Sequence, residues 1–241
     1  MNIGVIFAGG VGSRMHSKDK PKQFLELYNK PIIIHTLEHF EQNEKIDAIV
    51  IACVEEWLPY LEKLIYKFRI EKVRKLVPGG QTGQLSIYNG LKAAKEIAGD
   101  EKSIVLIHDG VRPLINPQLL TDNIESVIKY GSSVTAGIVK ETIVIVDDQM
   151  NVEQVPSRPK SRVAKAPQSF WLDEILAVHE QALSDGEENS IDSCTLMKKY
   201  GKKLHMIDGP YENIKITTPD DFYTMRAILE AKENNQIYGL E

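Results

Sequence analysis

Three glycines, an arginine and three lysines follow an apolar run near the start of the chain, in the stretch VIFAGGVGSRMHSKDKPKQFLEL at residues 5–27. Glycines allow backbone N–H groups to close around an anion, and basic side chains beside them add positive charge. Gly9, Gly10, Gly12, Arg14 and Lys22 are therefore candidates for a phosphate site. The alternative is a glycine-rich turn with solvated basic side chains, which is common in α/β proteins.

The spacing of these glycines fits neither of two familiar phosphate motifs. The dinucleotide fingerprint GxGxxG needs a third glycine where the chain has Met15. The P-loop needs Lys followed by Ser or Thr after its second glycine, where the chain has Ser13 and Arg14. The stretch is thus a phosphate-site candidate of another kind.

Two residues far along the chain could act on a bound phosphate. Asp109 ends the apolar run SIVLIHD, and open α/β sheets bind ligands at the carboxyl ends of their strands. Magnesium prefers hard oxygen ligands, so Asp109 is the candidate metal ligand, with a turn cap as the alternative. Lys215 lies in the apolar stretch NIKIT, which we expect to be a strand, where a lysine needs an anionic partner. We expect His108 to be structural, because its side chain should point away from Asp109.

A zinc-peptidase pattern, H-x-x-E-H, occurs at residues 35–39. His35 and His39 are four residues apart and could hold zinc on one face of a helix. Their apolar neighbours instead favour an ordinary core-facing helix. So short a motif is also easily met by chance.

The elements that would position these residues alternate between strands and helices. Apolar runs at 3–7, 46–53, 103–108 and 133–139 predict buried strands, and helical patterns lie at 32–42, 56–68, 83–97 and 116–130. Helices of this length between strands favour crossover connections. The pattern predicts an α/β sandwich of three layers with a mainly parallel sheet.

The pattern changes after residue 140. Residues 142–165 hold two β-rich pieces around DDQMN with little apolar material, which predicts a hairpin arm reaching toward a second copy. Further helices are expected at 173–184, 190–200 and 219–232, the last capped by Thr218 and Pro219, with a strand at 203–208. Without repeats or composition breaks, residues 1–241 are predicted to form a single domain.

Composition narrows the function classes. The 241 residues are 42% hydrophobic and 26% charged, as in a globular protein, and the net charge of −5 argues against general nucleic-acid binding. No apolar stretch approaches the length of a membrane span. Two isolated cysteines and the absence of a signal pattern predict a cytoplasmic protein.

The motifs as a set resemble one enzyme family. AGGVGSRM, PKQFLEL, KPIIIHTLEHF, GGQTGQLSIYNGL, IHDGVRP, APQSF and ENIKITTPDDF are similar to stretches of the cytidylyltransferases of methylerythritol phosphate and ribitol phosphate. The resemblance covers almost the whole chain. It implies a Rossmann-like core, magnesium, a homodimer with an exchanged β arm, and transfer of CMP from CTP to a polyol phosphate with release of pyrophosphate.

The resemblance also assigns roles to residues. Arg14 and Lys22 match the cationic pair around the triphosphate, where charge neutralisation and alignment dominate catalysis. Thr142, Arg158, Lys215 and Asp109 match the acceptor side, and Thr142 and Arg158 would act across the dimer. The positions matched to the nucleotide are Ala8, Gly9, Gly10, Val11, Gly12, Ser13, Gly80, Gln81, Ser86 and Asp109.

Three positions depart from the family pattern. Gln81 and Gly83 stand where acidic and arginine residues are frequent, and Ala166 stands where Thr is common. These departures favour a ribitol 5-phosphate type of acceptor over 2-C-methyl-D-erythritol 4-phosphate, which stays the alternative substrate. A nucleotide-binding regulatory protein is the non-enzyme alternative.

Overall fold

A seven-stranded sheet forms the centre of the protein. The computed structural model describes residues 1–9 and 20–238. The sheet has the strand order β11-β7-β10-β6-β1-β4-β5. The strands are β1 (Asn2–Ala8), β4 (Ala48–Cys53), β5 (Val73–Pro78), β6 (Ile104–Asp109), β7 (Ser132–Ile138), β10 (Arg162–Trp171) and β11 (Met206–Asp208). Only β10 runs antiparallel to its neighbours, β6 and β7, so the sheet is mainly parallel, as the sequence predicts.

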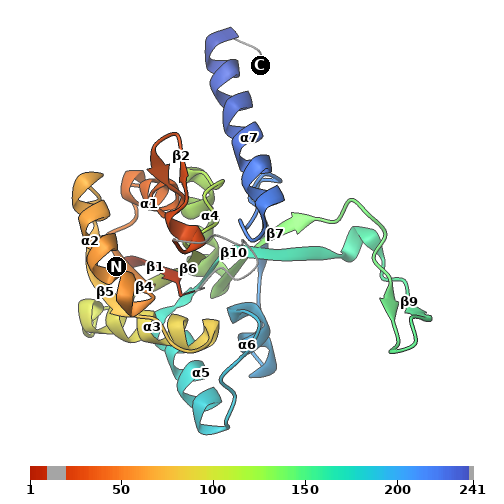
Figure 1. Ribbon diagram of the computed structural model, residues 1–241. Coiled ribbons are helices and arrows are strands. Elements are labelled where there is room, and N and C mark those ends of the chain that lie inside the picture. Colours follow the sequence, from red (N-terminus) through yellow and green to blue (C-terminus); the bar gives the residue numbers. More distant parts are fainter. Residues whose placement is uncertain (10–19, 239–241) are drawn as a thin grey trace.

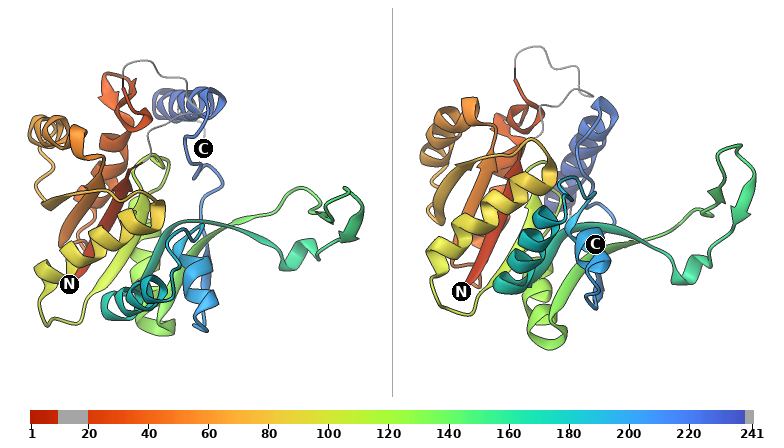
Figure 2. Two further views of the ribbon diagram at one scale, coloured as in Figure 1. Left: turned by 60° about the horizontal axis from the view of Figure 1, so that its bottom comes forward. Right: turned by 90° about the horizontal axis from the view of Figure 1, so that it is seen from below.

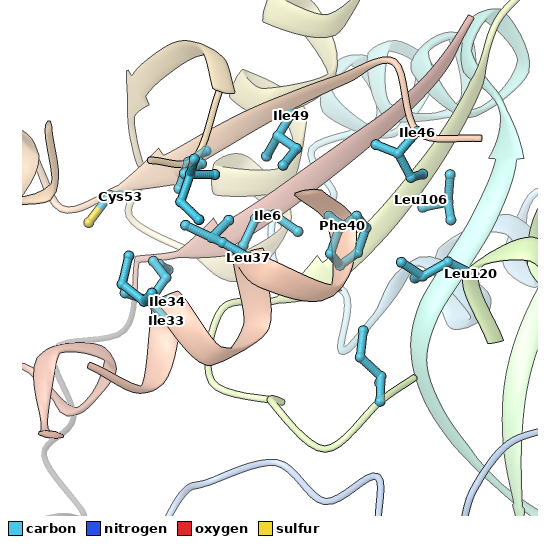
Figure 3. Packing of buried hydrophobic residues seen from close by; sticks show 14 of the residues in the cluster. Ile6, Ile33, Ile34, Leu37, Phe40, Ile46, Ile49, Cys53, Leu106 and Leu120 are labelled. Atoms are coloured by element: carbon cyan, nitrogen blue, oxygen red, sulfur yellow. The ribbon is translucent and has the colours of Figure 1, made fainter. Parts of the chain in front are cut away.

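Helices cover both faces of this sheet (Figures 1 and 2). One face packs against α1 (Ile32–Gln42), α2 (Leu58–Lys67) and α4 (Pro117–Tyr130). The other packs against α3 (Gly83–Ala98), α5 (Leu172–Ser184) and α6 (Ser193–Lys199). Strand residues alternate between the two cores: Ile6 packs with α1, whereas Val5 packs with α3. Leu37 and Phe40 of α1 meet Ile6 of β1 in Figure 3. The three-layer α/β architecture is confirmed.

The strands that the sequence analysis missed are the less apolar ones. β5 lies at the sheet edge and carries Arg74 and Lys75, so its pattern is not that of a buried strand. β10 contains Pro167, which usually argues against a strand, at a point where its register with β7 shifts. The predicted strand at 203–208 is shorter than expected and spans only Met206–Asp208.

The predicted arm is present but ends earlier than expected. β8 (Ile145–Val146) and β9 (Val152–Gln154) pair antiparallel as a hairpin, and Figure 1 shows this segment extending far from the body. The last four residues of the predicted range 142–165 belong instead to β10, because their backbone pairs with β7 in the central sheet. This pairing needs no apolar side chains, which is why the sequence pattern did not reveal it.

Near the end of the chain, one predicted strand is absent and the last helix is longer than the predicted 219–232. The stretch NIKIT at 213–217 forms no strand; a backbone hydrogen bond from Ile216 to the Val111 carbonyl (2.8 Å) holds it beside the loop after β6. α7 (Pro219–Tyr238) then begins at the predicted cap, where Thr218 Oγ1 accepts from Asp221 N (3.4 Å). Within residues 1–9 and 20–238, no helix is both long and apolar enough to cross a bilayer.

Candidate active site

A cavity of about 560 Å³ opens where β1, β4 and β5 end. Because these strands are parallel, their carboxyl ends meet at one edge of the sheet. We call it the glycine-lined cavity; its walls include Ala8, Gly9, Lys22, Gly79, Gly80, Gln81, Gly83, Ser86, Asp109 and Lys215. The structure thus brings together residues from five separate motifs of the sequence analysis.

Ser86 connects two of the glycine turns. Its hydroxyl accepts a hydrogen bond from Gly80 N (3.0 Å) and donates one to the Thr82 carbonyl (2.9 Å). A Cβ on residue 9 would lie 2.8 Å from Ser86 Oγ, and one on residue 80 would lie 2.8 Å from the backbone carbonyl carbon of Leu85. Gly9 and Gly80 are therefore required by close approach. Gly80 N already donates its hydrogen bond to Ser86, so it is not available to a ligand. Gly80 instead gives the cavity a wall without a side chain.

Lys22 lies in the short 3-10 helix Lys22–Phe24 and is 9% exposed. The next residue fixes this helix to β1, because Gln23 Nε2 donates to the Ala8 carbonyl (2.8 Å). Burial favours a higher pKa for Asp221, but hydrogen bonds from the backbone of Thr218 and Thr217, together with the charge of Lys22, lower that pKa. Lys22 therefore faces both the cavity and the start of α7.

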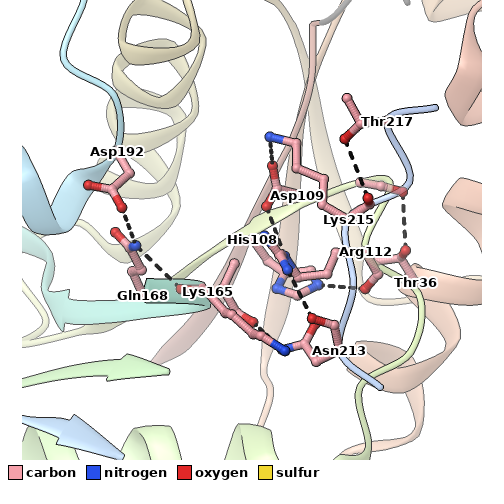
Figure 4. Close-up of polar contacts among 12 residues, drawn as sticks. Thr36, His108, Asp109, Arg112, Lys165, Gln168, Asp192, Asn213, Lys215 and Thr217 are labelled. Carbon is pink, nitrogen blue, oxygen red and sulfur yellow. Dashed lines mark hydrogen bonds and ion pairs between the residues drawn. The ribbon is translucent and has the colours of Figure 1, made fainter. Parts of the chain in front are cut away.

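Asp109, at the end of β6, forms ion pairs with two basic side chains (Figure 4). Lys215 Nζ lies 2.6 Å from its Oδ1, and Arg112 Nε lies 3.1 Å from its Oδ2. Burial alone would raise the pKa of Asp109, but the charges of Arg112 and Lys215 outweigh it and lower the pKa to about 2. The carboxylate is thus ionised at neutral pH, and Arg112 fixes the loop locally.

A second cavity, of about 200 Å³, lies on the other side of Asp109 and Lys215. We call it the side cavity; it shares Phe7, Gly83, Asp109 and Lys215 with the glycine-lined cavity. Two separate ligands could therefore meet at the Asp109–Lys215 ion pair. The side cavity also contains Ala166, one of the three departures from the family pattern.

Asn213 and Gln168 position this wall and were missed by the sequence analysis. Asn213 is fully buried; its Nδ2 donates to the Ala166 carbonyl (2.7 Å), and its own carbonyl accepts from Arg112 Nη1 (3.0 Å). Gln168 Nε2 donates to Asp192 Oδ2 (2.9 Å). Both residues are polar side chains within largely apolar stretches of the sequence, NIKIT and APQSF. That contrast is the one sequence signal that could have indicated them.

Several predicted residues do not join this cluster. Thr142 and Arg158 lie exposed on the arm, and neither lines either cavity of its own chain. Gly10, Val11, Gly12, Ser13 and Arg14 lie outside the described residues.

The two histidines of the zinc-like motif form hydrogen bonds with backbone carbonyls. His35 Nε2 lies 3.1 Å from the carbonyl of Leu27, in the short strand β2 (Glu26–Leu27), and His39 Nε2 lies 3.0 Å from the Pro113 carbonyl, so both side chains tie α1 to neighbouring segments. His108 is buried and its Nε2 lies 3.0 Å from the Arg112 carbonyl, which confirms its structural role.

Asp109 fits the chemistry of a magnesium ligand. In the part of the chain that the structure describes, no three His, Cys, Asp or Glu side chains cluster as a metal site. Magnesium needs only one or two protein oxygens when phosphates and water supply the rest. A carboxylate has about four lone-pair positions, so two ion pairs leave room for a metal.

Comparisons with known proteins identify the family. The family model for 2-C-methyl-D-erythritol 4-phosphate cytidylyltransferase matches residues 3–231. The chain belongs to this family. It is a nucleotidyltransferase, and the resemblance inferred from its motifs is confirmed.

Individual relatives agree with this assignment. The chain is 55% identical over 240 residues to a ribitol-5-phosphate cytidylyltransferase of Streptococcus agalactiae serotype V, covering 100% of both. It is 38% identical over 229 residues to a 2-C-methyl-D-erythritol 4-phosphate cytidylyltransferase of Clostridium botulinum, covering 95% of this chain and 97% of the relative. The crystal structure of 4-diphosphocytidyl-2C-methyl-D-erythritol synthase from Anaerococcus prevotii superposes with a TM-score of 0.82 at 30% identity, covering 95% of this chain and 96% of that one.

Proposed function

We propose that the protein transfers CMP from CTP to ribitol 5-phosphate and releases pyrophosphate. The choice of ribitol 5-phosphate as the acceptor rests on sequence identity. The chain is 55% identical to the ribitol-5-phosphate enzyme over its full length, against 38% to the methylerythritol-phosphate enzyme. The junction of two cavities at Asp109 and Lys215 supports a reaction between two bound substrates. 2-C-methyl-D-erythritol 4-phosphate is the second candidate acceptor, because the family model carries that name.

In this proposal CTP occupies the glycine-lined cavity. Gly79 and Gly80 leave a wall without side chains for the pyrimidine, and Lys22 on the cavity wall neutralises the triphosphate. Arg14 would share this role, as the family resemblance implies. An oxygen of the acceptor phosphate attacks the α-phosphorus, so one P–O bond forms while the bond to the β-phosphate oxygen breaks and pyrophosphate leaves. Lys215, on the shared wall, attracts the attacking phosphate toward the nucleotide. Bound magnesium would supply further positive charge to the phosphates, with Asp109 as its protein ligand.

We further propose that the protein acts in the cytoplasm as a homodimer with exchanged arms. The arm exposes apolar side chains, including Val144 (47%), Met150 (77%) and Val152 (62%), which a second copy could cover. Thr142 and Arg158 would then complete the acceptor site of the partner, since neither lines a cavity of its own chain.

The experiment is a pyrophosphate-release assay with CTP, with and without ribitol 5-phosphate. We expect release only when both substrates are present, formation of CDP-ribitol by mass spectrometry, loss of turnover in EDTA, and recovery with Mg²⁺ but not with Zn²⁺. Binding of CTP without any acceptor-dependent turnover would contradict the proposal and favour a regulatory protein. Turnover that resists EDTA would contradict the role of magnesium.

A further inference from the structure

Lys165 is a half-buried cation to which the family resemblance assigns no role in the sequence analysis. It lies on β10, two residues before Pro167, and lines the side cavity together with Arg112 and Lys215. Its Nζ donates to the Tyr211 carbonyl (3.1 Å) and lies 5.8 Å from the centre of the Tyr211 ring. Within the described ranges it makes no salt bridge, in contrast to Arg112 and Lys215, which share Asp109.

Among the described residues, no carboxylate lies within salt-bridge distance of Lys165, although the charge of Glu212 acts on it. Three cations and two carboxylates line this cavity: Arg112, Lys165 and Lys215 against Asp109 and Asp192. Asp109 is held by two of the cations, and Asp192 accepts hydrogen bonds from Gln168 and from Thr195 N. Burial, and then the charge of Arg112, lower the pKa of Lys165 and outweigh the opposite effect of Glu212, so its ammonium is held in a site that favours an incoming anion.

Gly137 on the neighbouring strand β7 makes room for this lysine. A Cβ on residue 137 would lie 2.7 Å from Lys165 Cε and 3.3 Å from its Nζ. The side chain therefore lies flat across the glycine, which directs the ammonium along the sheet toward Tyr211 and the cavity. A methyl group at this position would displace the flexible end of the lysine without disturbing the backbone.

We propose that Lys165 binds the phosphate of the acceptor and that Gly137 positions it for this contact. The inference rests on the proposed function, because the anion expected on this side of Asp109 is the acceptor's phosphate. The ammonium would hold that phosphate through a charge-assisted hydrogen bond while Lys215 holds it from the wall shared with the nucleotide. Lys165 contacts substrate only in the acceptor half, so its loss should raise the acceptor KM and spare CTP.

The test compares Lys165→Ala with Lys102→Ala, a matched control. The ammonium of Lys102 also lies near an aromatic ring, 4.0 Å from the centre of Trp171. Lys102 differs in its place: it precedes the amino end of β6, whereas Asp109 lies at the carboxyl end of that strand. We expect Lys165→Ala to raise the KM for the polyol phosphate about tenfold or more, with the KM for CTP unchanged. Lys165→Arg should restore part of the loss, and Lys102→Ala should behave as wild type. Equal KM values in wild type and Lys165→Ala would overturn the inference.

A second measurement needs no turnover, so it separates this inference from the proposed function. Titration with inorganic phosphate, followed by thermal shift, should show about tenfold weaker binding to Lys165→Ala than to Lys102→Ala. Lys165→Met, which keeps the apolar stem, replaces Lys165→Ala if the latter is unfolded. Unchanged phosphate affinity in the folded variant would overturn the contact, whichever acceptor the enzyme uses.

Gly137→Ala tests the positioning. In the wild-type background this change should raise the acceptor KM several-fold, because the added Cβ displaces the ammonium. In the Lys165→Ala background the same change should have no further effect, since the clashing atoms are gone. An equal rise in both backgrounds would overturn the role of Gly137.

Discussion

Asp109 lines both cavities, and its carboxylate forms ion pairs with cations from two separate parts of the chain. Arg112 lies three residues away, whereas Lys215 arrives from the segment before α7. Removing either cation would leave Asp109 buried with one partner fewer, which is costly for a charge that is only 5% exposed. The arrangement fixes Lys215 at the wall where the two proposed substrates meet.

Lys22 should act mainly on the rate of the chemical step. It lines the glycine-lined cavity, and the charge that it would neutralise grows as the phosphorus is attacked. We expect Lys22→Ala to lower kcat on the order of a hundredfold at saturating CTP. Lys20→Ala is the control, because Lys20 is exposed and lies outside both cavities. A near-normal kcat for Lys22→Ala would exclude this role.

The low pKa of Asp109 predicts a pH-dependent contribution to stability. Since the folded-state pKa of about 2 lies below the ordinary 3.8, the ion pairs stabilise the protein fully above that ordinary value. The contribution, about 2 kcal/mol, is lost as pH falls from about 4 toward 2. Urea unfolding of wild type and Asp109→Asn should therefore differ most at pH 7 and converge toward pH 2. A difference that does not change with pH would show that charge at Asp109 is not the cause.

Among the elements, the segment 209–218 carries site residues without being a helix or a strand. Asn213 holds it to β10 through the Ala166 carbonyl, and Ile216 holds it to the loop after β6. This segment sets the position of Lys215. Its geometry therefore depends on a few hydrogen bonds from distant strands.

Asn213→Ala should loosen this segment. It leaves the Ala166 carbonyl without its donor in a buried site, at a cost of about 1–3 kcal/mol. We expect a lower Tm and a raised KM for the acceptor, with the KM for CTP changed less. Asn89→Ala is the control, because its bond to the Pro78 carbonyl is exposed. A lower Tm without any change in the acceptor KM would limit Asn213 to a structural role.

The sequence predicts those elements that follow a simple burial pattern. Strands β1, β4, β6 and β7 are apolar runs between helices, and their order along the chain implies that Asp109 faces the glycine turns. β5 and β10 escape prediction because an edge position and a proline hide their pattern. Lys165 and Asn213 escape because their contacts depend on the register of β10 and on a segment more than forty residues farther along the chain.

At the scale of the whole molecule, two segments project from the body. The arm and most of α7 extend away from the sheet in Figure 1, and the arm carries Thr142 and Arg158 with it. A hairpin of two short strands is marginal on its own. A twofold partner would cover its apolar side chains and place Arg158 in the partner's acceptor site.

Subunit exchange tests this arrangement. Arg158→Ala and Lys215→Ala should each be inactive as pure proteins, because each lacks one cation for the acceptor phosphate. A mixed dimer would have one site lacking both cations and one intact site, so up to half of its sites should recover activity. Exchange is verified independently by fluorescence energy transfer between labelled subunits. No recovery in exchanged dimers would mean that Arg158 does not serve the partner's site.

The central claim is that this cytidylyltransferase prefers ribitol 5-phosphate, and a competition experiment tests it most directly. The protein is incubated with CTP and equal concentrations of ribitol 5-phosphate and 2-C-methyl-D-erythritol 4-phosphate. The initial ratio of the two CDP products, measured by mass spectrometry, equals the ratio of the two kcat/KM values. We predict that CDP-ribitol exceeds the other product by at least about a hundredfold, a difference that lost or misplaced polar contacts readily produce. An equal or reversed ratio would contradict the account.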